Sequence, residues 1–270
     1  MMTINKKGEQ DMEQTVVSFL GGVKDRFVEF CSVHNPQSAM DEKAWDSPMG
    51  PIDVAVSRGT VFEKASCIYC DLTIDTPPVL AEKYGCRDRQ MRALVLEIGL
   101  HPCNPHVPKG YIELRANIVD RVILAGGTDI FPYFDSPDDA SVFGDALLGL
   151  CSEHGVDYTS LQKTRADFFT SKYSGQNVGS HAGVYFFHLD QEDFPFFTGL
   201  SGTFFDVYGR LVAAHKDDVC TEEDMAHKLS VHGKWIQWVL LEDEGTRFGL
   251  DKGIPPDALL GAILPPVATF

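Results

Sequence analysis

The chain has 270 residues, of which 44% are hydrophobic and 23% charged, and its formal net charge is −16 at pH 7. This composition excludes a fibrous or disordered chain, and the length allows one large domain or two small ones. The negative charge argues against nucleic acid and anionic membranes as partners, because both bind basic surfaces.

The N-terminal residues 1–13 are polar and mixed in charge, and they resemble neither a signal peptide nor a transit peptide. No apolar run reaches the roughly 18 residues that a membrane helix needs. We therefore expect a cytoplasmic protein with a flexible segment over residues 1–13 and a single domain over residues 14–270.

The seven cysteines are an odd number, which favours reduced thiols. Cys67 and Cys70 form one C-x-x-C, but no second pair follows at zinc-finger spacing. The surrounding residues 65–72 read as a strand, where positions three apart point to opposite faces. We expect two half-buried strand cysteines rather than a zinc site.

Elements of both types alternate in the first half of the chain. Leu20, Val23, Phe27 and Phe30 repeat at helical spacing and predict an amphipathic helix over residues 12–33, followed by a Pro- and Gly-containing loop. The next predicted elements are a hairpin over 54–73, a short helix over 77–84, a strand over 94–100, a proline-rich break over 101–108, and strands over 110–118 and 121–125. Gly126 and Gly127 then predict a tight turn.

The second half is mostly helical. Ser136 and Pro137, followed by two aspartates, mark the start of a helix that we expect to reach His154. We predict further helices over 158–171, 195–214, 221–231 and 256–264, strands over 184–189 and 234–241, and a glycine-bearing loop over 175–183. The whole pattern indicates an α+β fold with a large antiparallel sheet flanked by helices on both faces.

Several segments, taken in order, resemble motifs of one enzyme family. They are VFEKA at residues 61–65, HPCNPHVP at 101–108, AGGTDIFPYF at 125–134, GTRFGL at 245–250 and AILPP at 262–266. Their order and sequence resemble the oxygen-dependent coproporphyrinogen III oxidases, over about residues 19–270. The resemblance implies a coproporphyrinogen oxidase-like domain, a homodimer, and a reaction in which dioxygen converts two propionate side chains of a reduced tetrapyrrole to vinyl groups.

The resemblance also implies site residues. It requires no cofactor beyond dioxygen, and in the family a carboxylate holds the pyrrole N–H while arginines hold the propionates. The family's catalytic aspartate matches Asp129, and the arginine of its central strand matches Arg115. Tyr111 stands where the family has histidine, and Glu113 where it has asparagine.

Other family positions have lost their charge. Cys103 replaces an arginine, and the loop over residues 172–179 lacks the family's arginines. A buried carboxylate that loses a bidentate arginine is hard to satisfy otherwise. The departures therefore favour a smaller and less anionic substrate than a tetrapyrrole.

The strand over 110–118 places Tyr111, Glu113 and Arg115 on one face, where a solvated Glu–Arg pair is the alternative interpretation. Asp129 after two glycines could instead cap a turn. If Glu113 lies near Asp129, one of these carboxyl groups should have a raised pKa and act as a base.

The remaining candidates would bind substrate. Trp235 could stack on a flat ring from the predicted strand over 234–241. The candidate set is His101, Asn104, His106, His188, Trp235, Gln237 and Arg247. His101, His106, His181 and His188 could be imagined around iron or copper with Glu113, but no pair has a standard ligand spacing, so no metal is expected.

The sequence therefore favours a diverged dioxygen-dependent oxidase that decarboxylates or desaturates a carboxylate-bearing pyrrole or indole compound. In this hypothesis Asp129 binds the ring N–H and Arg115 binds the carboxylate. One alternative is a true coproporphyrinogen III oxidase with a basic rim of Lys109, Lys172, Lys234 and Arg247. Another is an inactive tetrapyrrole-binding or scaffold relative, in which Arg115 and Asp129 would not converge.

Overall fold

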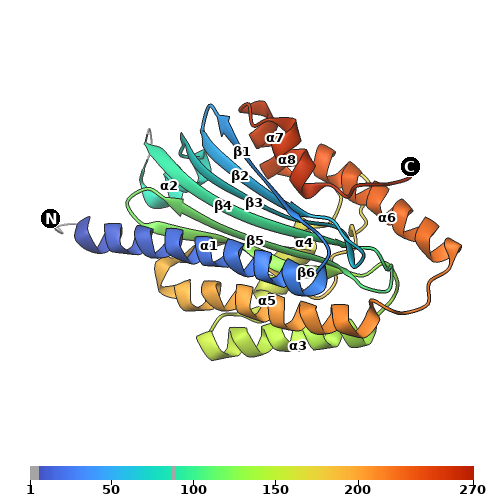
Figure 1. Cartoon of the computed structure of the whole chain (residues 1–270). Helices are drawn as coiled ribbons and strands as arrows, with labels where there is room; N and C mark the ends of the chain where they lie inside the picture. The colour runs from blue at the N-terminus through green and yellow to red at the C-terminus, as the bar shows by residue number, and fades with distance from the viewer. Residues whose placement is uncertain (1–5, 87–88) are drawn as a thin grey trace.

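A seven-stranded antiparallel sheet forms the centre of the computed structural model, which describes residues 6–86 and 89–270 (Figure 1). The strands follow one another in chain order across the sheet, so each pairs with its neighbour in the sequence. They are β1 (Met40–Ser47), β2 (Gly50–Ser57), β3 (Phe62–Asp75), β4 (Gln90–Pro102), β5 (Lys109–Ile118), β6 (Val122–Phe131) and β7 (Val184–Asp190).

Helices cover both faces of this sheet, as predicted (Figure 1). One face carries α1 (Lys6–His34) and α5 (Phe194–His215), and α3 (Pro137–His154) packs on α5. The other face carries α6 (Glu222–Leu241), α7 (Glu244–Asp251) and α8 (Pro256–Ile263). Of the remaining helices, α2 (Pro78–Tyr84) connects β3 to β4, α4 (Tyr158–Phe168) packs on β7, and a 3-10 turn spans Gln191–Asp193.

Strand β4 shows how the sequence separates the two faces. Leu94, Leu96, Ile98 and Leu100 all join the core cluster shared with α1 and α5. The alternate position Glu97 therefore points to the face covered by α6, α7 and α8. Cys67 and Cys70 also fall in different core clusters, which confirms that they point to opposite faces.

The predicted turn at Gly126 and Gly127 was wrong, because β6 continues through both glycines to Phe131. The turn comes earlier, between β5 and β6. Gly126 has a φ of +126°, and a Cβ there would lie 2.1 Å from the carbonyl oxygen of Glu113. The two glycines allow the neighbouring strands to approach closely and lie beside a register shift between β6 and β7. They do not reverse the chain.

The predicted strand over residues 234–241 was also wrong, because α6 continues to Leu241. The helix begins at a capping box formed by Thr221 and Asp224. Trp235, Trp238 and Val239 are all buried, at the i, i+3 and i+4 spacing of a helix face. The alternation that suggested a strand was accidental.

The structure differs from the predicted elements in three smaller ways. Strand β1 replaces part of the predicted loop, and its mostly exposed, charged sequence hides the strand pattern. Helix α7 was not predicted. Helix α1 begins at Lys6, so the expected flexible segment is helical from there, and residues 1–5 lie outside the described part.

Candidate active site

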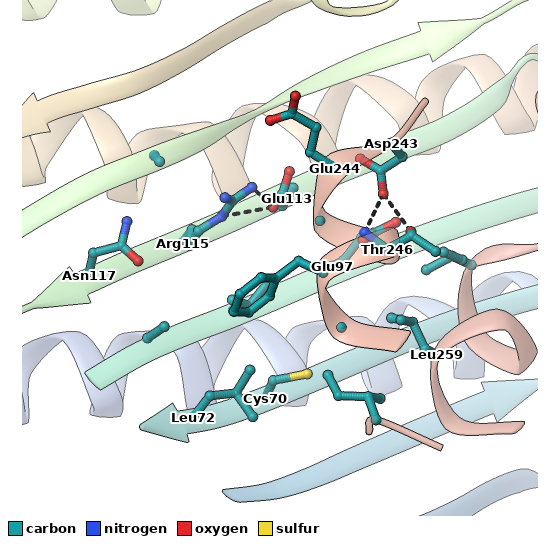
Figure 2. Close-up of a pocket in the computed structure, with 18 of the residues that line it drawn as sticks. Cys70, Leu72, Glu97, Glu113, Arg115, Asn117, Asp243, Glu244, Thr246 and Leu259 are labelled. Atoms are coloured by element: carbon teal, nitrogen blue, oxygen red, sulfur yellow. Dashed lines mark hydrogen bonds and ion pairs between the residues drawn. The ribbon is translucent and has the colours of Figure 1, made fainter. Parts of the chain in front are cut away.

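A cavity of about 370 Å³ lies between the sheet and the helices α6 to α8. Its floor consists of β3, β4 and β5, and α7 closes it from above (Figure 2). The polar residues in its wall are Glu97, Tyr111, Glu113, Arg115, Asn117, His188, Asp243, Glu244 and Thr246, and its flat apolar walls include Trp235, Trp238, Phe187 and Phe248.

One row of residues across the sheet organises the polar part. Glu97 on β4 pairs with Glu113 on β5, which pairs with Gly127 on β6, which pairs with Tyr185 on β7. A Cβ at Gly127 would lie 2.7 Å from the Tyr185 ring. Because Gly127 has no side chain, Tyr185 reaches across it, and its hydroxyl donates to Glu113 Oε2 at 2.5 Å.

Glu113 is a fully satisfied carboxylate. Its Oε1 accepts from Arg115 Nε at 3.1 Å and also contacts Arg115 Nη2, while its Oε2 accepts from Tyr111 at 3.1 Å and from Tyr185. Burial and the nearby Glu113 charge raise the pKa of both tyrosines well above the usual value. Both phenols therefore stay protonated and keep donating.

Glu97 lies directly across from this cluster in a different environment. Within residues 6–86 and 89–270, no hydrogen-bond donor contacts its carboxyl group. Burial, followed by the charge of Glu113, raises the pKa of Glu97 well above its usual value. Of these two facing carboxyl groups, Glu97 is therefore the one suited to proton transfer, while Glu113 is held by its donors.

Helix α7 adds two more carboxyl groups above the sheet. Asp243 caps the helix, because its Oδ2 accepts from Thr246 N at 2.8 Å and from Thr246 Oγ1 at 2.5 Å. Burial raises the pKa of Asp243. Glu244 follows in the cavity wall, on the same side as the Glu113–Arg115 pair (Figure 2).

The family model described as coproporphyrinogen III oxidase matches residues 15–270. The chain belongs to this family. It is 27% identical over 247 residues to the oxygen-dependent coproporphyrinogen-III oxidase of Drosophila melanogaster, an alignment that covers 82% of this chain and 63% of that protein. The chain thus matches less than two thirds of the length of that curated relative.

In this member of the coproporphyrinogen III oxidase family, five of the predicted site residues line the cavity. They are Tyr111, Glu113, Arg115, His188 and Trp235. His188 is exposed, and partial burial lowers its pKa. Tyr111, Glu113 and Arg115 come together as the strand pattern predicted, and Arg115 is paired with Glu113 rather than left open for a ligand.

Asp129 lies opposite Tyr111 on the same face of the sheet but outside the cavity. It is 1% exposed and lies 3.8 Å from Arg165 Nε. Its oxygens accept from Ser180 Oγ, His181 N, Ala182 N and Ile130 N. Asp129 thus fixes the loop before β7, a placement that does not favour its predicted contact with a ring N–H or with Glu113.

The proline-rich segment between β4 and β5 also lies away from the cavity. His101 is buried against the edge of His232, with ring centroids 5.6 Å apart. Asn104 donates to the carbonyl of Asp218 at 2.7 Å, and His106 stacks on Phe134 at 5.4 Å. These contacts hold residues 101–108, which include the end of β4, against the end of α5 and against α6, outside the cavity that contains Glu113.

Gln237 and Arg247 are exposed on the helices and do not line the cavity. Gln237 was expected beside Trp235 on a strand, and the helical geometry turns it to solvent instead. Arg247 reaches only the carbonyl of Leu241, at 3.5 Å.

Four residues of the site were not predicted from the sequence: Glu97, Asp243, Glu244 and Tyr185. A signal existed for Glu97, because a lone acid opposite the leucines of an apolar strand must face a second, polar environment. Asp243 followed by Thr246 is a helix N-cap pattern.

In the described ranges, no three His, Cys, Asp or Glu side chains group as a metal site, and no helix is long and apolar enough to cross a membrane.

Proposed function

We propose that this chain oxidises a small substrate built on one electron-rich pyrrole- or indole-type ring, with dioxygen as the oxidant. The substrate gives up two electrons and two protons, and dioxygen takes them to form hydrogen peroxide. The observation that carries this proposal is the facing pair Glu97 and Glu113, one unpartnered and one saturated, in the wall of a ring-sized cavity.

Glu113 is the fixed member of this pair. A carboxylate has about four acceptor sites, and Arg115, Tyr111 and Tyr185 occupy them all. Glu97 is therefore the group that exchanges protons. Its raised pKa makes its carboxylate a stronger base than that of an ordinary glutamate, so it can accept a proton from the ring N–H or the adjacent carbon and then return one to reduced oxygen.

The cavity supports a substrate smaller than a tetrapyrrole. Its volume of about 370 Å³ is near the lower end of the range for small-molecule sites, roughly 300–1,000 Å³. Among the described residues, Arg115 is the single Lys or Arg in its wall, and Glu113 already pairs with it. Lys109, Lys172, Lys234 and Arg247 do not form a basic rim there.

A binding or scaffold role is the second candidate, because Arg115 and Asp129 do not meet in one cavity. Oxygen uptake separates the two. Purified protein incubated in air with a panel of alkyl-substituted pyrroles and indoles should consume dioxygen and form peroxide in equal amounts. No uptake across the panel would favour the binding role.

Replacement of the proton carrier gives the sharper test. Glu97→Gln should lower turnover of an accepted substrate at least about 100-fold, the usual loss for a general acid–base group. Glu153→Gln is the matched control, because Glu153 is an exposed glutamate on α3, beyond the opposite face of the sheet. Full turnover in a folded Glu97→Gln variant would refute the assignment.

A further inference from the structure

We propose that the cavity selects a substrate whose side chain ends in a protonated amine, so that the ligand is an arylalkylamine rather than a ring bearing a carboxylate. This inference rests on the proposed function for the ring and adds the charge of its side chain. Four carboxyl groups from three elements line the cavity, namely Glu97 on β4, Glu113 on β5, and Asp243 and Glu244 at the start of α7.

Among the described residues, Arg115 is the one Lys or Arg in the cavity wall, and Glu113 already pairs with it. The guanidinium of Arg115 donates to Glu113 from both Nε and Nη2. A substrate carboxylate would have to displace Glu113 from Arg115, and it would add a fifth carboxyl group to the same small volume. Like charges at this range in a partly desolvated site repel strongly.

An ammonium group, by contrast, finds open acceptors. Glu97 has no donor among the described residues, and only Oδ2 of Asp243 is used, by Thr246. Glu244 extends from the same turn (Figure 2). An ammonium carries three N–H donors and no acceptor, so it matches a set of unpaired carboxyl oxygens.

The apolar wall suits the aromatic part of such a ligand. Trp235 and Trp238 stack at 5.3 Å between ring centroids, and Phe187 and Phe248 are exposed where they line the cavity. Trp235 is 5% exposed and is held by this stacking, so it offers a rigid aromatic wall to a flat ring.

Three indoles that share a two-carbon side chain at C3 test the charge preference: indole-3-ethylamine, 3-ethylindole and indole-3-propionate. Calorimetric titration of the intact protein should give at least about 10-fold tighter binding of the amine than of the neutral compound, and the weakest binding for the propionate. Glu244→Gln should reduce the preference for the amine several-fold. Glu153→Gln, which removes the same charge far from the cavity, should leave it unchanged.

The outcomes separate this inference from the proposed function. Equal or tighter binding of the propionate would overturn the charge inference, and oxygen uptake with the propionate would still support the oxidase. Tight binding of the amine without oxygen consumption would support the charge inference and reject the oxidase. Failure of all three indoles to bind, or a preference for the amine that survives Glu244→Gln, would overturn the inference.

Discussion

Replacement of Asp129 by asparagine distinguishes a structural anchor from a catalytic group. The carboxylate accepts two hydrogen bonds on each oxygen and faces Arg165 at 3.8 Å. If the amide NH₂ takes the place of Oδ2, the hydroxyl of Ser180 can rotate and accept from it, but the backbone N–H of His181 loses its acceptor. If it takes the place of Oδ1, the N–H groups of Ala182 and Ile130 both lose theirs.

The better of these two orientations sets the expected magnitude. A backbone N–H that loses its acceptor on burial costs about 1–3 kcal/mol. Burial raises the pKa of Asp129 despite the nearby Arg165, so the folded state gains no net stability from this charge and its removal adds no further cost. Asp129→Asn should therefore lower the free energy of unfolding by about 1–3 kcal/mol, out of a usual total of about 5–15 kcal/mol.

Urea unfolding followed by circular dichroism measures this change, provided that the slope with denaturant stays constant. The control is Asp167→Asn on α4, where the exposed carboxylate pairs only with Lys163 and the same substitution should change stability by less than about 0.5 kcal/mol. A loss below 1 kcal/mol for Asp129→Asn, together with a collapse of turnover, would refute the anchoring role and restore the catalytic one.

The remaining predictions concern stability and assembly. Gly127→Ala should lower the free energy of unfolding by about 1–3 kcal/mol, measured by urea titration, because the added methyl would lie 2.2 Å from the carbonyl oxygen of Val184. The raised pKa of Glu97 means that the folded state retains a proton that the unfolded state releases, so Glu97 contributes less stability as pH rises from about 4.3. Glu97→Gln should therefore raise the melting temperature at pH 8 and leave it unchanged at pH 4. Hydrogen bonds to Asp218 and Asp139 outweigh partial burial and raise the pKa of His215, so His215→Gln should lower the melting temperature at pH 6 and have no effect at pH 9. Light scattering should give a mass near twice 29.9 kDa, because the resemblance to the family implies a homodimer.

The sheet could be predicted wherever one face of a strand is uniformly apolar. The leucines of β4 and the alternation of Tyr111, Glu113 and Arg115 on β5 give both the strand and its orientation. The continuation of β6 through Gly126 could not be predicted, because paired glycines usually indicate a turn. Only the close approach of the Glu113 carbonyl on β5 explains why a glycine stands inside this strand.

The hydrogen-bonded polar cluster of the candidate site could be predicted only where its residues share one strand. Glu97 and Glu113 are 16 positions apart in sequence, and only the register of β4 against β5 makes them neighbours. Asp243 and Glu244 come from a helix that closes the cavity from a distant part of the chain. The role of Asp129 depends on the backbone N–H groups of His181 and Ala182, which cannot be read from residue types because every residue except proline has one.

Incubation with coproporphyrinogen III in air tests the central claim most directly. Among the described residues, the wall of the acid-lined cavity of about 370 Å³ holds no Lys or Arg besides Arg115, which Glu113 already pairs, so a tetracarboxylate would lack cationic partners there. We predict no carbon dioxide release and no product of lower mass under conditions in which an accepted pyrrole or indole compound is oxidised. Efficient conversion of coproporphyrinogen III to the divinyl product would contradict the account and assign this chain the activity for which its curated relative is named.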